Sequence, residues 1–255
     1  TGGTDNDLLV GGVTGAFGGV DTLYGGDGAD TLIAGSTQGD SLFGEAGNDS
    51  LVGGTAADTL FGGSGNDVID GTQGGGDLLY GEDGNDTIRA SSDSDTLFGG
   101  SGNDVLYAAM VGGTDNGGEL LYGGDGADTL YAGAAVSNLA DTLYGGDGAD
   151  KFVVATNVSA AGITGSSITG ADIFSFSDGT DKITLVGFGF TTSGSPGLST
   201  NKGGSFGATG TIVVSGNSTS NLVEVYLNAN AGANNYAKIT VNGVTTLDLT
   251  DFEFA

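Results

Sequence analysis

The sequence of 255 residues contains no cysteine, no histidine and no tryptophan, and only one proline. Without cysteine the chain has neither disulfide bonds nor a thiol nucleophile. Without histidine it has neither the H-E-x-x-H helix of a zinc protease nor the base that activates a catalytic serine. Residues 203–207 fit the nucleophile pattern G-x-S-x-G, but no histidine exists to activate Ser205. The composition therefore predicts that this chain is not an enzyme.

Basic residues are scarce, with 5 Lys and Arg against 32 Asp and Glu and a formal net charge of −27 at pH 7. This excludes a nucleic-acid binder that works by neutralising phosphates. It also argues against adsorption to an anionic membrane surface. No run of residues approaches the roughly 20 apolar residues of a membrane helix, so no direct membrane insertion is expected. A chain without disulfides is compatible with an extracellular protein that is stabilised by metal.

Glycine is abundant, at 54 residues, and high charge combined with glycine is typical of disorder. Against that interpretation, 37% of the residues are hydrophobic and they recur at a fixed period. A disordered tail lacks such regular apolar spacing, and we therefore expect a folded chain.

A nine-residue unit of the form G-G-x-G-x-D-x-U-x, where U is a large apolar residue, recurs along residues 1–153. Complete G-G-x-G-x-D copies begin at Gly25, Gly62, Gly99, Gly123 and Gly145. The copies that begin at Gly44 and Gly81 lack only the second glycine, and the copy at Gly2 lacks the third. This pattern is that of a calcium-binding parallel β-helix repeat. The chain here resembles the repeats-in-toxin family, whose nonapeptides wind into a β-roll around rows of Ca²⁺.

Successive copies start about 18 residues apart, because a second, less regular turn lies between each pair. These intervening turns cover residues 11–24, 34–43, 53–61, 71–80, 90–98, 108–122 and 132–144. Each has an acid before its apolar step: Asp21, Asp40, Asp58, Asp77, Asp95, Glu119 and Asp141. Two half-turns per coil predict an all-β fold, a parallel β-roll or flattened β-solenoid. We call the edge with the nonapeptides the regular edge and the opposite edge, with its insertions and lost glycines, the irregular edge.

Alternation along each short strand is expected to point the U residues inward. Ile69, Leu106 and Leu130 then fill the core from one sheet. Leu23, Leu42, Leu60, Leu97 and Leu143 fill it from the other. Such a narrow core cannot stabilise one coil alone, so neighbouring coils must stack.

Stacked coils lie about 4.8 Å apart, which places the sixth-position aspartates of the regular edge in one column. Two unit charges at that distance repel by roughly 1 kcal/mol in water and by several-fold more at a partly buried site. Divalent cations between the turns would reverse the sign of this energy. Ca²⁺ accepts six to eight oxygens, including carbonyls, whereas Zn²⁺ prefers the histidine and cysteine that this chain lacks. Multiple Ca²⁺ ions are therefore the expected cofactor.

In the family, the aspartate carboxylate and the carbonyls of turns one coil apart share each ion. The resemblance implies the following ligands on the regular edge: Asp7; Gly25, Asp27, Gly28 and Asp30; Gly44, Gly47 and Asp49; Gly62, Gly65 and Asp67; Gly81, Gly84 and Asp86; Gly99, Gly102 and Asp104; Gly123, Gly126 and Asp128; Gly145, Gly148 and Asp150. On the irregular edge an acidic turn face without ions is a serious alternative. The best candidates there are Asp40, Asp58, Asp77 and Asp95.

The ninth position of every irregular half-turn is aromatic: Tyr24, Phe43, Phe61, Tyr80, Phe98, Tyr122 and Tyr144. We call this set the aromatic column. If the preceding leucines face inward, these rings face outward on one sheet, one per coil. The column is either a stacked ladder that stiffens the solenoid or an interface for another chain, since large exposed apolar patches mark interaction sites. At the matching positions the opposite sheet carries Ile33, Val52, Asp70, Arg89, Tyr107, Tyr131 and Val153, which is typical of a solvated face.

The periodicity ends after Val153, which divides the chain into a β-roll over 1–153 and a β-rich C-terminal cap or assembly domain over 154–255. Strands are expected at 173–176, 182–186, 211–214, 222–227, 237–241 and 245–249, in an antiparallel arrangement. Residues 172–185 resemble the segment that follows the repeats in this family. Residues 249–255 resemble its C-terminal type I secretion signal, the alternative being a terminal edge strand.

Two functions fit this sequence. The first is a non-catalytic, secreted calcium-binding module that folds in external Ca²⁺ and self-associates into a surface structure such as an S-layer or filament on a bacterial cell. The second is the secretion and folding tail of a larger toxin, protease or lipase. Type I secretion machinery is an expected partner in both. A chain that begins with threonine is typical of a processed product or a fragment, and an upstream H-E-x-x-H or G-x-S-x-G with histidine would favour the second.

Overall fold

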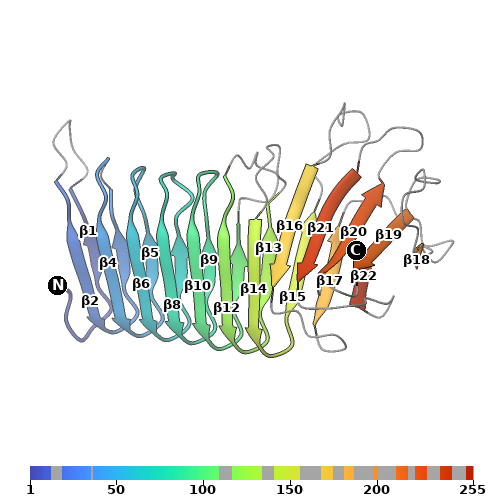
Figure 1. Ribbon diagram of the computed structural model, residues 1–255. Coiled ribbons are helices and arrows are strands. Elements are labelled where there is room, and N and C mark those ends of the chain that lie inside the picture. Colours follow the sequence, from blue (N-terminus) through green and yellow to red (C-terminus); the bar gives the residue numbers. More distant parts are fainter. Residues whose placement is uncertain are drawn as a thin grey trace.

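The computed structural model describes residues 1–12, 19–35, 37–108, 117–133, 141–155, 168–174, 181–186, 198–199, 211–217, 222–228, 236–242 and 251–254. The chain winds into a flattened solenoid whose coils each contribute one strand to each of two sheets (Figure 1). The predicted all-β parallel β-roll is thus confirmed. Within the described part, no helix is long and apolar enough to span a membrane.

The two sheets differ in strand length and composition. The ten-stranded sheet contains, in spatial order, β1 (Leu8–Val10), β3 (Thr31–Ile33), β5 (Ser50–Val52), β7 (Val68–Asp70), β9 (Thr87–Arg89), β11 (Val105–Tyr107), β13 (Thr129–Ala132), β15 (Lys151–Ala155), β17 (Lys182–Val186) and β22 (Phe252–Phe254). The twelve-stranded sheet contains β2 (Thr22–Asp27), β4 (Ser41–Ala46), β6 (Thr59–Ser64), β8 (Leu78–Asp83), β10 (Thr96–Ser101), β12 (Leu120–Asp125), β14 (Asp141–Asp147), β16 (Ile168–Phe174), β21 (Tyr236–Asn242), β20 (Leu222–Asn228), β19 (Thr211–Asn217) and β18 (Leu198–Ser199).

The core is one row of apolar side chains from each sheet, packed face to face. Strand register places each leucine or isoleucine beside its equivalent in the next coil, as in the pairing of Leu60 with Leu79. Leu42, Leu60, Leu97 and Leu143 from one sheet and Ile69, Leu106 and Leu130 from the other are fully buried, while Leu23 in the first coil is partly buried. Full burial of such a side chain contributes about 2 kcal/mol. The core therefore sits where the sequence predicts it.

The fourth-position glycines let consecutive turns on the regular edge stack backbone on backbone. Gly65 has a φ of 140°, and a Cβ there would collide with the carbonyl of Gly47 in the preceding coil. Gly84 meets the carbonyl of Gly65 in the same way. Any side chain would push the coils apart, so this edge keeps a uniform spacing that positions its aspartates.

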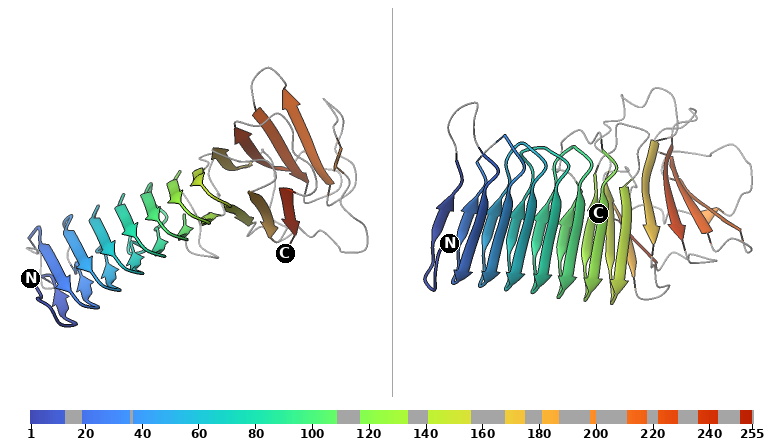
Figure 2. Two further views of the ribbon diagram at one scale, coloured as in Figure 1. Left: turned by 90° about the horizontal axis from the view of Figure 1, so that it is seen from below. Right: turned by 60° about the vertical axis from the view of Figure 1, so that its left-hand side comes forward.

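Both solenoid sheets continue beyond the last nonapeptide. β16 pairs in parallel with β14, β17 with β15, β21 with β16 and β22 with β17. The buried Ile183 in β17, preceded by the buried Asp181, repeats the acid-then-apolar step of the coils and explains the parallel continuation. Figure 2 shows this continuity from two further sides.

The expected antiparallel arrangement of the C-terminal region holds for only part of it. Among the described strands, antiparallel pairing is confined to β19 with β20 and β20 with β21. The strand expected at 245–249 lies outside the described residues.

Candidate metal-binding turns

The sixth-position aspartates of the regular edge form one continuous hydrogen-bonded column. In each step the backbone N–H of one aspartate donates to Oδ1 of the aspartate one coil further along, as from Asp67 to Asp86 at 2.7 Å. The same bond joins every consecutive pair from Asp7 to Asp150, at distances of 2.7 to 3.0 Å. Each carboxylate is thereby fixed in one orientation by the neighbouring coil.

The second carboxylate oxygen, Oδ2, is buried without a hydrogen-bond partner in seven of these aspartates: Asp30, Asp49, Asp67, Asp86, Asp104, Asp128 and Asp150. Each Oδ2 lies beside the first glycine of its own turn. A Cβ on Gly44, for example, would meet both Oδ2 of Asp49 and the carbonyl oxygen of Gly62 in the next coil. Gly25, Gly62, Gly81, Gly99 and Gly123 repeat this arrangement. A carboxylate oxygen and a carbonyl oxygen thus converge on a space that only glycine leaves open.

This donor set fits Ca²⁺. The cation takes carboxylate and carbonyl oxygens in a flexible geometry, and it would satisfy the buried oxygens that no protein donor reaches. In the described part of the chain, no group of three or more acidic side chains converges on one point. Each ion would accordingly be held by one or two aspartates and otherwise by turn carbonyls.

Burial raises the pKa of the column's aspartates from Asp49 to Asp150. The pKa of Asp67 rises to about 7, chiefly because burial disfavours the charged form; the Asp49 N–H opposes this rise, and the carboxylates of Asp86 and Asp49 add to it. Burial likewise raises the pKa of Asp86, Asp104 and Asp150 to about 6. Near neutral pH a column without cations is therefore costly to keep fully ionised, and a divalent cation would reverse that balance.

The irregular edge has a similar column but a different pattern of satisfied oxygens. N–H groups of Asp21, Asp40, Asp58 and Asp77 donate to Oδ1 of the next acid, at 2.6 to 2.8 Å. Oδ2 of Asp58 accepts the N–H of Gly54 at 2.5 Å, and Oδ2 of Asp95 accepts the N–H and Oγ of Ser91 at 2.8 and 3.0 Å. Oδ2 of Asp40 and of Asp77 is buried without a partner. The turns of this edge thus donate hydrogen bonds to Oδ2 of Asp58 and Asp95 but leave Oδ2 of Asp40 and Asp77 without a partner.

Two features of the regular edge were not predicted from the sequence. The aspartate column continues past the nonapeptides, because the N–H of Asp150 donates to Oδ1 of Asp181 at 3.0 Å. An asparagine ladder runs along the outside of the same turns, with the N–H of residues 66, 85 and 103 donating to Oδ1 of Asn48, Asn66 and Asn85. The D-x-U step at residues 181–183 could have indicated the longer aspartate column, and the repeated Asn-Asp pairs could have indicated the asparagine ladder.

The aromatic column is continuous, as its periodicity predicts. Its seven rings stack in sequence with centroids 4.6 to 4.9 Å apart and interplanar angles of 2 to 11°. Phe43 and Phe61 are half-buried, and Tyr24 is exposed at the first coil. The ring faces cover one another, so the column presents ring edges to its surroundings.

The opposite sheet is less uniform than an ordinary solvated face. Tyr107 stacks on Tyr131 with centroids 4.5 Å apart, and the Arg89 guanidinium lies 5.5 Å from the centre of the Tyr107 ring. Burial and the neighbouring Tyr131 raise the pKa of Tyr107, and the Arg89 guanidinium offsets only part of this rise. These three side chains form a local stack, which the mixed composition of this face does not indicate.

Comparison with known proteins adds the family. The family model "RTX calcium-binding nonapeptide repeat (4 copies)" matches residues 16–37, 43–75, 72–106, 113–135 and 139–154. The solenoid belongs to the repeats-in-toxin family. Repeats of this family bind calcium, and the several copies give the solenoid multiple Ca²⁺ ions.

Solved structures similar to this repeats-in-toxin chain include the AlgE6R3 subunit from the Azotobacter vinelandii mannuronan C5-epimerase, at 20% identity and a TM-score of 0.26 over 83% of this chain and 81% of that one. The extracellular lipase LipA from Serratia marcescens is 15% identical with a TM-score of 0.22, over 90% of this chain and 45% of the lipase. At these scores neither likeness carries an argument about activity. No curated protein sequence matches the chain.

Proposed function

We propose that this chain is a non-catalytic extracellular module that folds when it meets external calcium and then self-associates into a surface structure. The observation that carries the proposal is the row of seven buried Oδ2 atoms without hydrogen-bond partners on the regular edge. Buried acceptors of this kind are costly, and a cation that binds only the wound coil couples its binding free energy to folding.

Acidity supports an extracellular role for the same module. A chain with a formal charge of −27 is held extended by self-repulsion when calcium is scarce, which suits an export substrate. Where calcium is plentiful, the ions neutralise the aspartate columns and the coils wind. The type I secretion machinery that this family uses, and the signal proposed at residues 249–255, fit that sequence of events. Residues 249, 250 and 255 lie outside the described part of the chain.

The proposal gives the chain no chemistry of its own. The sequence holds no histidine or cysteine, and residues 201–210, which include Ser205, lie outside the described residues. The aromatic column provides a contact surface for assembly, since it exists as a continuous row of rings only when the coils are wound. Calcium would thus control folding and association through one event.

Circular dichroism and static light scattering test the proposal together. In chelator we expect a largely unfolded chain; millimolar Ca²⁺ should induce β structure, and assembly should follow it. Mg²⁺ at the same concentration is the matched control, because it prefers to keep its waters and should not wind the coil. A strong β spectrum that persists in chelator at about pH 8 would defeat calcium-coupled folding, while folding without any rise in scattering would defeat self-association alone.

A further inference from the structure

Glutamate replaces glycine at two positions of the regular pattern, and both glutamates lie on the outer face of the twelve-stranded sheet. Register aligns Glu45 in β4, Gly63 in β6 and Glu82 in β8 across three neighbouring strands. Glu45 and Glu82 have φ angles of 76° and 75°, a region that favours glycine. Holding a non-glycine residue there costs free energy. The glycines at this position in the other coils avoid that cost.

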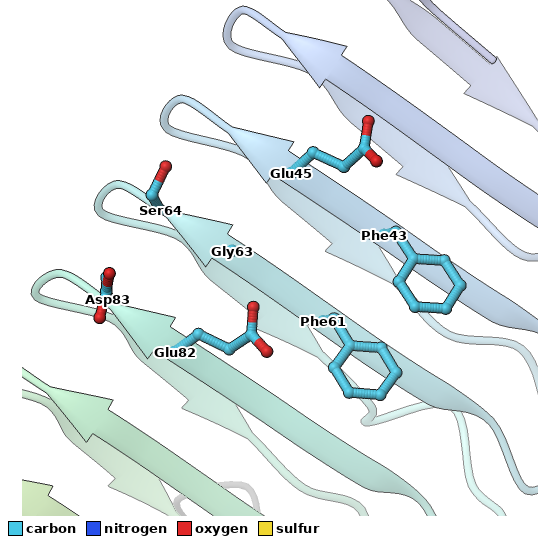
Figure 3. A pocket seen from close by; sticks show the side chains of 7 residues that line it. All are labelled: Phe43, Glu45, Phe61, Gly63, Ser64, Glu82 and Asp83. Atoms are coloured by element: carbon cyan, nitrogen blue, oxygen red, sulfur yellow. The ribbon is translucent and has the colours of Figure 1, made fainter.

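The two glutamates bracket an open pocket with an apolar wall. Its lining includes Phe43 and Phe61 of the aromatic column, the backbone of Gly63 as floor, and Asp83 at the turn end. Figure 3 shows Glu45 and Glu82 on either side of Gly63, with the Phe43 ring on the strand of Glu45 and the Phe61 ring on the strand of Gly63. Two strand spacings, about 10 Å, separate the backbones of the two glutamates, and their exposed side chains can turn toward a cationic group that lies between them.

Among the described residues, no basic side chain is paired with the glutamates of this face. Strands β2, β4, β6, β8, β10, β12 and β14 contain no lysine or arginine, and the sole arginine, Arg89, lies on the other sheet. Among the described residues, neither Glu45 nor Glu82 makes an ion pair or a side-chain hydrogen bond, whereas Asp83 accepts a hydrogen bond from Ser101 at 2.8 Å. Both glutamates are exposed. The face therefore combines unneutralised negative charge with half-buried ring edges.

We propose that the pocket between Glu45 and Glu82 binds a lysine or arginine side chain of a basic partner polypeptide. The aliphatic stem packs on the edges of Phe43 and Phe61, and the charged head lies between the two carboxylates. The matching face of a second copy is disfavoured as occupant, because it is equally acidic; self-association through the aromatic column therefore requires a different surface of the second copy. A bare metal ion is also disfavoured, because both glutamates are exposed, unlike the buried aspartates of the regular edge.

The sequence contains its own controls for this site. The paired substitutions Glu45→Gly and Glu82→Gly restore the residue type that the other coils carry and relieve the left-handed backbone, so the doubly substituted protein folds. The matched control is D125S with D147S, which removes the same charge from the same sheet edge and places there the residue that β6 and β10 carry. Circular dichroism with calcium verifies that each double variant winds normally.

The experiment measures fluorescence anisotropy of a labelled hexalysine peptide with the calcium-loaded full chain at about 0.15 M salt, where charges further apart than a Debye length are screened. We expect the E45G/E82G protein to bind at least tenfold more weakly than wild type, and the D125S/D147S protein to change less than twofold. A hexapeptide of acetyl-lysine should bind at least tenfold more weakly than hexalysine.

Two outcomes would overturn the site. Equal losses in the two double variants would show that overall acidity attracts the peptide. Equal binding of the acetylated peptide would show that the surface is merely apolar. Both outcomes are independent of self-association, which the peptide assay does not measure.

Discussion

The backbone N–H of Asp67 donates to Oδ1 of Asp86 at 2.7 Å, while Oδ2 of Asp86 is buried without a hydrogen-bond partner. One oxygen of this carboxylate thus fixes the stacking of two coils, and the other faces the space between glycine turns. The same division of roles is repeated along the regular edge. It links the winding of the solenoid to the binding of calcium at the level of single atoms.

Replacing Asp86 by asparagine should separate these two roles. The amide can keep Oδ1 as acceptor for the Asp67 N–H, but it removes the charge and replaces one oxygen with an NH₂ group. We expect calcium-induced folding to require more Ca²⁺, with the loaded form destabilised by about 2 kcal/mol. Circular dichroism during a calcium titration measures the shift. An unchanged midpoint would show that Asp86 does not hold calcium.

The irregular edge provides a paired test. Oδ2 of Asp77 has no partner, whereas Oδ2 of Asp95 already accepts hydrogen bonds from Ser91. Ion occupancy on this edge should therefore be discontinuous, with ions beside Asp40 and Asp77 and gaps beside Asp58 and Asp95. A crystal structure in calcium gives the occupancies directly. If Asp77→Asn and Asp95→Asn raise the calcium midpoint equally, the hydrogen-bond pattern does not decide occupancy.

The pKa values predict opposite effects of acid on the metal-free and calcium-loaded forms. Burial raises the pKa of Asp67 to about 7 and that of Asp104 to about 6, above the ordinary value of 3.8. Between about pH 4 and 7 the wound metal-free chain therefore binds more protons than the unfolded chain. This contribution to its stability increases as the pH falls through this window and is lost as the pH rises through it.

Calcium requires the ionised carboxylates, so its affinity should fall as the pH drops through the same window. In chelator we expect more β structure at about pH 5.5 than at about pH 8, and a higher calcium midpoint at about pH 5.5 than at about pH 7.5. Circular dichroism measures both. Asp67→Asn is the control, since the amide does not titrate and should reduce the pH response. A metal-free chain that is equally unfolded at both pH values would contradict the prediction.

The solenoid could be predicted from the sequence because the period of the repeat determines which residues of successive coils lie side by side. The same spacing that brings Leu60 beside Leu79 also brings Asp67 beside Asp86, so core and column follow from one repeat. Because the strand register is the same in every coil, the repeat is compatible with few other folds. The aromatic column follows from the same argument, since its residues share one position.

Departures from the repeat could not be interpreted in this way. Glu45 and Glu82 were recognisable only as missing glycines, because a repeat pattern does not reveal that the backbone keeps a positive φ. The hydrogen bonds that cap Asp58 and Asp95 arise from turns whose conformation the eroded motif does not specify. The parallel pairing of β21 with β16 depends on docking against an earlier strand, a long-range effect that local strand patterns do not encode.

The last prediction concerns two rings of the aromatic column that do not line the glutamate pocket. Phe98 and Tyr122 stack with centroids 4.9 Å apart on β10 and β12. Replacing both by serine should leave calcium-induced β structure intact, because the buried leucine rows are untouched, but should reduce calcium-dependent assembly. Light scattering and electron microscopy measure assembly. The control protein carries Phe98→Tyr and Tyr122→Phe, which keeps both rings and should assemble like wild type. If the serine variant also assembles like wild type, the column only stiffens the solenoid, and the surface for self-association must lie elsewhere on the chain.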